Sequence, residues 1–275
     1  MSKKKHASPC PSPLELELPQ GGADTHAHLN MEDFNGDLSA TLDRAFASGV
    51  SHIGNVLLNV EEYYQSCQRF TDCQRIFFIL GVHPNESSQY GPNTIPQLRA
   101  IVCNDTRIRA IGEIGLDFFR AYCPPQTQEK TFRALLRLAR ELERPVVIHS
   151  REATKATLAV LEEEHFKGYP LLWHCFGGDT TLMEHIIRQG WHLSIPGPVG
   201  YPANKTLREV ARDVPLESLL LETDAPYLAP QEWRGKRNEP AFTVFIAACI
   251  ARERGMDTAE LWTACGENAR RFFSL

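Results

Sequence analysis

The chain has 275 residues, of which 43% are hydrophobic and 23% charged, and this is the balance of an ordinary globular protein. Its formal net charge of −5 argues against a protein that coats nucleic acid non-specifically, because such a protein needs a broad basic surface. No uninterrupted apolar run approaches the roughly 20 residues that cross a membrane, so we expect no membrane partner.

The start of the chain and the cysteines indicate where the protein works. Residues 1–20 contain three lysines but no apolar stretch behind them, so they do not resemble a secretory signal. Their Ser, Pro and Lys content predicts a disordered tail, followed by one domain over residues 21–275. The eight cysteines are dispersed and include no Cys-x-x-Cys pair, which favours reduced thiols over a disulfide framework. We therefore expect a cytoplasmic protein, and a monomer.

The first apolar segment carries Asp24, His26 and His28 at every second position. In an extended strand these side chains project to one face, so two imidazoles lie side by side with a carboxylate one step deeper. Neutral imidazole is a common ligand of divalent metals, and a nearby carboxylate can fix its tautomer. Alone, so short a pattern fits a polar strand end more often than a metal site. The choice depends on partners further along the chain.

Short apolar strands alternate with amphipathic helices through the rest of the chain. Further strands are predicted near residues 52–58, 75–80, 108–112, 145–148, 171–173, 191–195 and 219–221. Helices are predicted near residues 37–49, 61–73, 95–103, 124–142, 152–164, 181–189, 205–212, 241–252 and 258–265. Eight strand-helix units in a chain of this size predict a TIM-type (β/α)8 barrel. An open doubly wound sheet is the alternative, although it gives no reason for eight units. No glycine-rich nucleotide-binding loop appears.

Polar residues follow the apolar strands in a regular way. At the carboxyl ends of the predicted strands stand His26, His28, His83, Glu113, His149, His174 and Asp224. In a (β/α)8 barrel those ends converge on one mouth, where the active site lies. Nitrogen and oxygen ligands without cysteine suit zinc, manganese, iron or magnesium.

Seven short motifs in one order make the resemblance to a family specific. They are Asp24-Thr-His-Ala-His-Leu29, Gly81-Val-His-Pro84, Gly112-Glu-Ile-Gly-Leu-Asp117, His149-Ser-Arg-Glu-Ala153, His174-Cys-Phe-Gly-Gly178, Leu221-Glu-Thr-Asp-Ala-Pro226 and Gly235-Lys-Arg-Asn-Glu-Pro240. Over residues 22–273 the chain resembles the TatD family of metal-dependent hydrolases, whose characterised members are largely deoxyribonucleases. Two departures concern substrate detail: Gly178 replaces a common serine, and Phe118-Phe119 replaces a pair that commonly contains tyrosine.

The resemblance implies two divalent metal ions, Mg²⁺, Mn²⁺ or Zn²⁺. One ion would be held by His26, His28, Glu113 and Asp224. The other would be held by Glu113, His149 and His174, with the Glu113 carboxylate bridging the pair. Two such ions activate a water and neutralise charge on a phosphoryl group.

The remaining site residues follow from these positions. Asp224 is the candidate general base, while Glu222 and Asp24 are expected to anchor groups behind the ligands. Arg151 and His83 could hold phosphate oxygens, or instead form a loop salt bridge and a packed ring. Beyond the eighth strand, the basic residues Arg234, Lys236 and Arg237 suit a nucleic-acid backbone but also an ordinary solvated loop; of these, Arg237 is the candidate substrate contact.

Three functions remain open at this point. The first hypothesis is a metal-dependent phosphodiesterase, namely a DNase that acts on single strands or strand ends. The second is an amidase or deacylase, because the same metal and water unit can attack a carbonyl group. The third is a partner-binding protein that keeps a metal with little turnover, and the complete ligand set speaks against it. The sequence leaves open the metal, the direction of attack, DNA against RNA or a small molecule, and the oligomeric state.

Overall fold

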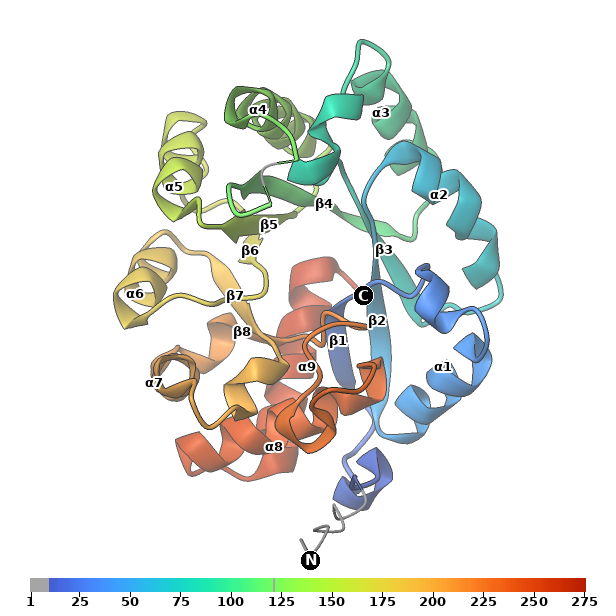
Figure 1. Ribbon diagram of the computed structural model, residues 1–275, viewed down its shortest axis with the longest axis vertical. Coiled ribbons are helices and arrows are strands. Elements are labelled where there is room, and N and C mark those ends of the chain that lie inside the picture. Colours follow the sequence, from blue (N-terminus) through green and yellow to red (C-terminus); the bar gives the residue numbers. More distant parts are fainter. Residues whose placement is uncertain (1–9, 121) are drawn as a thin grey trace, which may run out of the picture.

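The computed structural model describes residues 10–120 and 122–275, and they form one parallel sheet rolled into a barrel with helices outside it (Figure 1). The strands pair in sequence order and are β1 (Gly22–Ala27), β2 (Val50–Leu57), β3 (Ile76–Leu80), β4 (Ile108–Asp117), β5 (Val146–Arg151), β6 (Leu171–Trp173), β7 (His192–Ile195) and β8 (Leu219–Leu221). A parallel bridge between Ala27 and Ala225 joins the end of β1 to the segment that follows β8. The predicted (β/α)8 barrel is confirmed, and the open sheet is not the fold.

The helices lie between the strands as expected. They are α1 (Leu38–Ala47), α2 (Val60–Ser66), α3 (Thr94–Asn104), α4 (Pro125–Glu141), α5 (Thr154–Glu163), α6 (Thr180–Arg188), α7 (Lys205–Asp213), α8 (Thr243–Arg254) and α9 (Thr258–Phe273). The predicted α2 is shorter than expected, because the chain continues as the 3-10 turn Cys67–Phe70. Helix α9 is longer than predicted, because it continues beyond residue 265 to Phe273. No helix within the described part of the chain is long and apolar enough to cross a membrane.

The helix α4 shows how the sequence makes these elements. A proline at the first helical position needs no hydrogen-bond donor there and sets the backbone angle. Phe132, Leu135, Leu136 and Ala139 recur at helical spacing and are all buried against the sheet. Strand β3, unlike helix α4, has no exposed face. All five of its residues are buried, as expected for a strand covered on both faces.

Side chains inside the barrel fill its amino end. A small apolar cluster joins inward residues of seven strands to the end of α9. Phe273 packs 4.6 Å, between ring centroids, from Phe77 near the start of β3, and Phe272 lies 5.2 Å from His192 at the start of β7. Because α9 closes this end, the carboxyl ends of the strands are the open end.

The segment before β1 differs from the expected tail. Residues 1–9 lie outside the described part, but Pro13–Leu16 form a 3-10 turn capped by Ser12. The Trp233 indole donates a hydrogen bond to the Pro11 carbonyl (3.1 Å), and the Trp262 indole donates one to Pro19 (2.9 Å). The composition of the segment does not indicate these contacts, because each tryptophan lies more than 200 positions after the proline that it contacts.

Candidate metal centre

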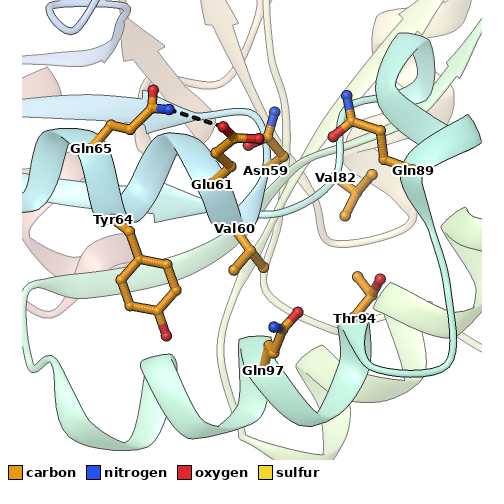
Figure 2. A pocket seen from close by; sticks show the side chains of 9 residues that line it. All are labelled: Asn59, Val60, Glu61, Tyr64, Gln65, Val82, Gln89, Thr94 and Gln97. Carbon is orange, nitrogen blue, oxygen red and sulfur yellow. Dashed lines mark hydrogen bonds between the residues drawn. The ribbon is translucent and has the colours of Figure 1, made fainter.

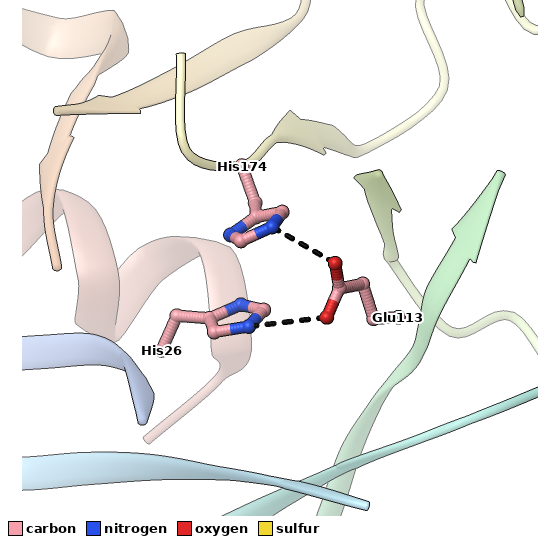
Figure 3. Close-up of side chains that lie close together, drawn as sticks. All are labelled: His26, Glu113 and His174. Atoms are coloured by element: carbon pink, nitrogen blue, oxygen red, sulfur yellow. Dashed lines mark ion pairs between the residues drawn. The ribbon is translucent and has the colours of Figure 1, made fainter. Parts of the chain in front are cut away.

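Glu113 on β4 lies between imidazoles from three other strands. Its Oε1 atom is 2.5 Å from His149 Nδ1 and 2.9 Å from His174 Nε2. Its Oε2 atom is 3.3 Å from His26 Nε2, on the opposite side of the carboxylate. Figure 3 shows the two oxygens directed at two different rings, which themselves stack with centroids 3.8 Å apart. One carboxylate therefore serves two groups of ligands, as the bridging prediction requires.

A carboxylate stands behind each imidazole of the first group, which we call the β4–β6 half (Glu113, His149 and His174). Asp117 Oδ2 is 3.2 Å from His149 Nε2, and Glu222 Oε2 is 3.3 Å from His174 Nδ1. A carboxylate that accepts a hydrogen bond from the N–H of one ring nitrogen leaves the other nitrogen free to donate its lone pair to a metal. Both rings are thereby oriented with the free nitrogen towards Glu113.

Asp117 is a site residue that the sequence reasoning missed. Its side chain is buried, and its other oxygen accepts hydrogen bonds from the backbone amides of Phe119 and Arg120. The predicted strand ended near Glu113, whereas β4 continues to Asp117 and keeps the same face every second residue. The signal in the sequence was the even spacing between Glu113 and Asp117. Gly115 obscured it, because a glycine at this point is also typical of a turn that ends the strand.

The second group, the β1–β8 half, consists of His26, His28 and Asp224. Asp224 Oδ1 lies 3.4 Å from His28 Nε2 and 3.8 Å from His26 Nε2. The Asp224 amide donates to the His26 carbonyl (2.9 Å), which holds the loop after β8 against β1. Both ring nitrogens of His26 are buried and have no hydrogen-bond partner among the described residues. Such nitrogens are costly unless something else binds them.

Asp24 contacts backbone rather than imidazole. Its Oδ1 atom accepts hydrogen bonds from the amides of His26 (3.3 Å) and Thr223 (2.9 Å), and its Oδ2 atom accepts from the Thr223 hydroxyl. Burial raises the pKa of Asp24 to about 8, against the lowering effect of these donors. The expected anchor behind the ligands is therefore an anchor between two strands.

Burial and neighbouring groups set the charge of each member of the cluster. Burial would raise the pKa of the Glu113 carboxyl, but the His174 and His149 rings outweigh it and hold that pKa well below its usual range. Burial likewise opposes a charge on His174, yet Glu113 and Glu222 raise its pKa well above the usual range. His26 behaves differently, because burial and the neighbouring His174 lower its pKa. A neutral imidazole among ionised carboxylates is the state that a metal ligand requires.

The donor set fits divalent metal ions. Three groups bring ligand atoms within 4.8 Å of one another: His26, Glu113 and His174; His26, His28 and Asp224; and His83, Glu113 and His149. All donors are imidazole nitrogens or carboxylate oxygens, which suit zinc, manganese or magnesium. The buried Nε2 atom of His26, which makes no hydrogen bond and faces the Glu113 and Asp224 carboxylates, is the observation that a metal would satisfy.

His83 and Arg151 lie beside the β4–β6 half. His83 Nε2 is 3.7 Å from Glu113 Oε1, and its Nδ1 atom accepts a hydrogen bond from the Asn85 amide (3.1 Å). The position of His83 thus allows both a substrate contact and the packed ring. Arg151 ends β5 and places its guanidinium over the Phe119 ring, 4.0 Å from the centroid. It makes no ion pair with any residue that the structure describes, so the loop salt bridge is not seen.

The basic residues after β8 are engaged elsewhere. Arg237 forms a bidentate ion pair with Asp37 (2.7 and 2.8 Å) and donates to the Asp33 carbonyl (2.7 Å). Arg234 lies over the ring of Tyr201. Among the described residues, Arg237 contacts no member of the cluster, so the structure gives it a role in joining the loop to α1.

A separate cavity of about 410 Å³ lies outside the ring of strands, between α2, α3 and the turn after β3 (Figure 2). Its lining is rich in amides, from Asn59, Gln65, Gln89 and Gln97, and holds no cationic side chain. None of the cluster residues lines it. The chemistry of the molecule therefore collects at the barrel mouth and not in this cavity.

Histidines and carboxylates gathered at the carboxyl ends of a (β/α)8 barrel define the class of metal-dependent hydrolases. A family model described as TatD related DNase matches residues 23–274. The chain belongs to the TatD-related DNase family.

Individual relatives agree with this assignment over nearly the whole chain. The protein named 3'-5' ssDNA/RNA exonuclease TatD from Citrobacter koseri is 36% identical over 260 residues, covering 92% of this chain and 98% of that protein. The uncharacterized metal-dependent hydrolase YabD from Bacillus subtilis is 32% identical, with the same coverage. The structure of the TatD homologue YJJV from Escherichia coli K12 is similar at a TM-score of 0.85 and 29% identity, covering 92% of this chain and 98% of that chain.

Proposed function

We propose that this protein is a divalent-metal-dependent exonuclease that hydrolyses phosphodiester bonds at the ends of single-stranded DNA. The observation that carries the proposal is the Glu113 carboxylate, whose two oxygens face His174 and His26 in two separate ligand groups. Similarity to TatD exonucleases supports the substrate class. The shared barrel alone would fit amide hydrolysis as well.

The proposed ligands are those expected from the sequence. Glu113 would hold both ions, with His149 and His174 completing the β4–β6 half and His26, His28 and Asp224 completing the β1–β8 half. Two divalent ions held there would lower the pKa of a water and neutralise charge on the phosphoryl group. Their identity, among Mg²⁺, Mn²⁺ and Zn²⁺, is part of the proposal to be tested.

Asp224 is the proposed general base. Its side chain is 15% exposed, whereas those of Glu113 and Glu222 are 4% and 0% exposed, so it is the most accessible of these carboxylates to an attacking water. Burial raises the pKa of Asp224, but the hydrogen bond and charge of His28 outweigh burial and lower it. The carboxylate is therefore ionised near neutral pH and able to accept a proton.

The other residues hold the reacting groups in place. Asp117 and Glu222 keep the His149 and His174 rings oriented, so the ligand geometry exists before substrate arrives. Arg151 and His83 are proposed to hold phosphate oxygens, because both lie at the mouth beside Glu113 or its neighbours. A cytoplasmic location, a monomeric state and a catalytic domain starting near residue 21 stay predictions.

A direct test starts from the metal-free protein and reloads it separately with Mg²⁺, Mn²⁺ or Zn²⁺. Each reloaded sample is then given two kinds of substrate. One is single-stranded DNA labelled at either end, and the other is a panel of small amides. We expect stepwise shortening of the DNA from one end only, dependent on metal. Hydrolysis of amides without any shortening of DNA would refute the proposal in favour of an amidase.

A further inference from the structure

Most of the exposed aromatic side chains in the described part of the chain stand in loops at the barrel mouth. Among the described residues, five large hydrophobic side chains are exposed: Leu14, Tyr64, Phe119, Tyr122 and Tyr227. Three of the five stand in the loops that follow β4 and β8, which are loops at the carboxyl ends of strands. Exposed rings that gather beside one site mark an interaction surface more often than rings that are scattered singly.

Phe119 borders the β4–β6 half of the cluster. Its amide donates a hydrogen bond to Asp117 Oδ1 (3.0 Å), and the other oxygen of that carboxylate holds His149. The Arg151 guanidinium lies over one face of the Phe119 ring, yet half of the side chain is exposed. One cation and one open ring are thus presented together, a pairing that single-stranded nucleic acid binds through phosphate and base.

Tyr227 borders the β1–β8 half. Its ring centroid lies 6.2 Å from that of His28, and its amide donates to the Asp224 carbonyl (2.9 Å). Phe119 and Tyr227 thus stand beside different halves of the cluster, one in the loop after β4 and one in the loop after β8.

We propose that Phe119 and Tyr227 form a stacking platform for the nucleobases of a single strand whose phosphate lies at the metal centre. A contact to phosphate alone needs cations and has no use for open rings. Stacking on a ring requires a base that is not already stacked and paired, so the platform selects single strands over duplexes. Every base has an aromatic face, so the selection would be tolerant of sequence.

This inference rests on the proposed function, and a binding experiment separates the two. The probes are a short fluorescent oligothymidylate with phosphorothioate linkages and a strand of the same length and linkages that lacks all bases. Binding to the Mg²⁺-loaded protein is followed by fluorescence anisotropy, and gel electrophoresis afterwards checks that the probes stayed intact. The two probes differ only in the groups that the platform would recognise.

The variants are Phe119→Ala, Tyr227→Ala and the conservative Phe119→Trp. Tyr64→Ala is the matched control, because Tyr64 is comparably exposed but lies on α2 beside the outer cavity. We expect each alanine variant to weaken binding of the oligothymidylate about tenfold, with little change for the baseless strand. Phe119→Trp and Tyr64→Ala should bind as the unchanged protein does. Thermal melting confirms that each variant is folded.

Equal weakening for both probes, or no weakening, would overturn the platform. Failure of the unchanged protein to bind the oligothymidylate more tightly than the baseless strand would overturn it too. Base-dependent binding that is lost in the alanine variants, in a protein that cuts no DNA, would uphold the platform and refute the nuclease. Cleavage of DNA without base-dependent binding would do the reverse.

Discussion

The two halves of the metal centre differ in what holds their imidazoles. In the β4–β6 half, Asp117 and Glu222 each hold one ring nitrogen and turn the other towards Glu113. In the β1–β8 half, His26 has no hydrogen-bond partner on either nitrogen, and Asp24 holds the surrounding backbone instead. The rings of the first half are therefore oriented by carboxylates behind them, whereas the His26 ring is held by stacking on His174 and has no carboxylate behind it.

The two halves use the same types of ligand, but the groups that hold those ligands in place differ. A ring that is already oriented loses little freedom when a metal binds, so its half should bind metal more tightly. The β1–β8 half carries Asp224, the proposed base. Tight binding and proton transfer are thus assigned to different halves, and substitutions can separate them.

The largest effect is expected where the halves meet. Glu113→Ala should abolish metal-dependent turnover and lower the occupancy of both sites, because one carboxylate faces both groups. His26→Ala should lower occupancy of the β1–β8 half more than that of the other. Elemental analysis with parallel activity assays checks this, with Glu61→Ala at the outer cavity as control. Full metal content in Glu113→Ala would contradict the bridging role.

The next effect concerns the base in the β1–β8 half. Asp224→Asn keeps the shape and one coordinating oxygen but removes most of the basicity. We expect the variant to stay folded, to keep at least one metal and to lose at least ~10²-fold in kcat on phosphodiesters. Single-turnover cleavage with metal content measured in parallel is the test. A near-normal kcat would remove Asp224 from the mechanism.

A smaller effect should appear in the β4–β6 half when its support is weakened. Glu222→Gln and Asp117→Asn should each lower metal affinity by about 10- to 100-fold, with the larger loss for Glu222, which also accepts from Ser194 and the Cys175 amide. Competition with a metal-binding dye measures the affinity. Asp24→Asn serves as the comparison, since it should lower the melting temperature more than the metal affinity. Unchanged affinity in all three variants would mean that the metal alone orients the rings.

The smallest effect is on the free energy of unfolding in acid, and it concerns the ion pair between Arg237 and Asp37. The hydrogen bond from Arg237 lowers the pKa of Asp37 to about 2 from an ordinary 3.8. A lowered pKa means that the ion pair stabilises the fold fully above about pH 4 and ceases to do so as the pH falls towards 2. Solvent screens this exposed pair, so Asp37→Asn should cost only about 0.2–1 kcal/mol near pH 7. Urea unfolding of both proteins at pH 7 and near pH 2.5 should show the difference shrinking in acid; a constant difference would exclude this pair as the cause.

The barrel and its ligands were predictable because both depend on local patterns. Apolar strands alternate with amphipathic helices, and His149 or His174 directly follows an apolar run, so topology brings these side chains to one mouth. Asp117 was missed because Gly115 interrupts the strand pattern. The structure explains this glycine, since its φ of +142° and the His149 carbonyl, 2.0 Å from where a Cβ would lie, leave room for no other residue.

Contacts over long sequence separations could not be predicted. Arg237 pairs with Asp37, which lies 200 positions away, and no local pattern announces such a partner. The same holds for the residues before β1, whose carbonyls accept from tryptophans near the other end of the chain. One sequence without its relatives reveals neighbours along the chain and periodic faces, but not specific pairs across the fold.

The contacts that close the barrel affect the order in which the chain can fold during its synthesis. The hydrogen bond from Thr25 to Leu221 spans 196 positions, and that from Thr223 to Asp24 spans 199, whereas Glu113 and His149 are only 36 apart. Contacts of long span form late, since a long loop must be closed first. On the ribosome Glu113, His149 and Asp117 can thus come together before the last strand has been synthesised, whereas Glu222, which orients His174, arrives only with that strand. A chain that stops before residue 219 lacks Asp224, the proposed general base, so we expect the nascent protein to have no nuclease activity until the last strand has been made.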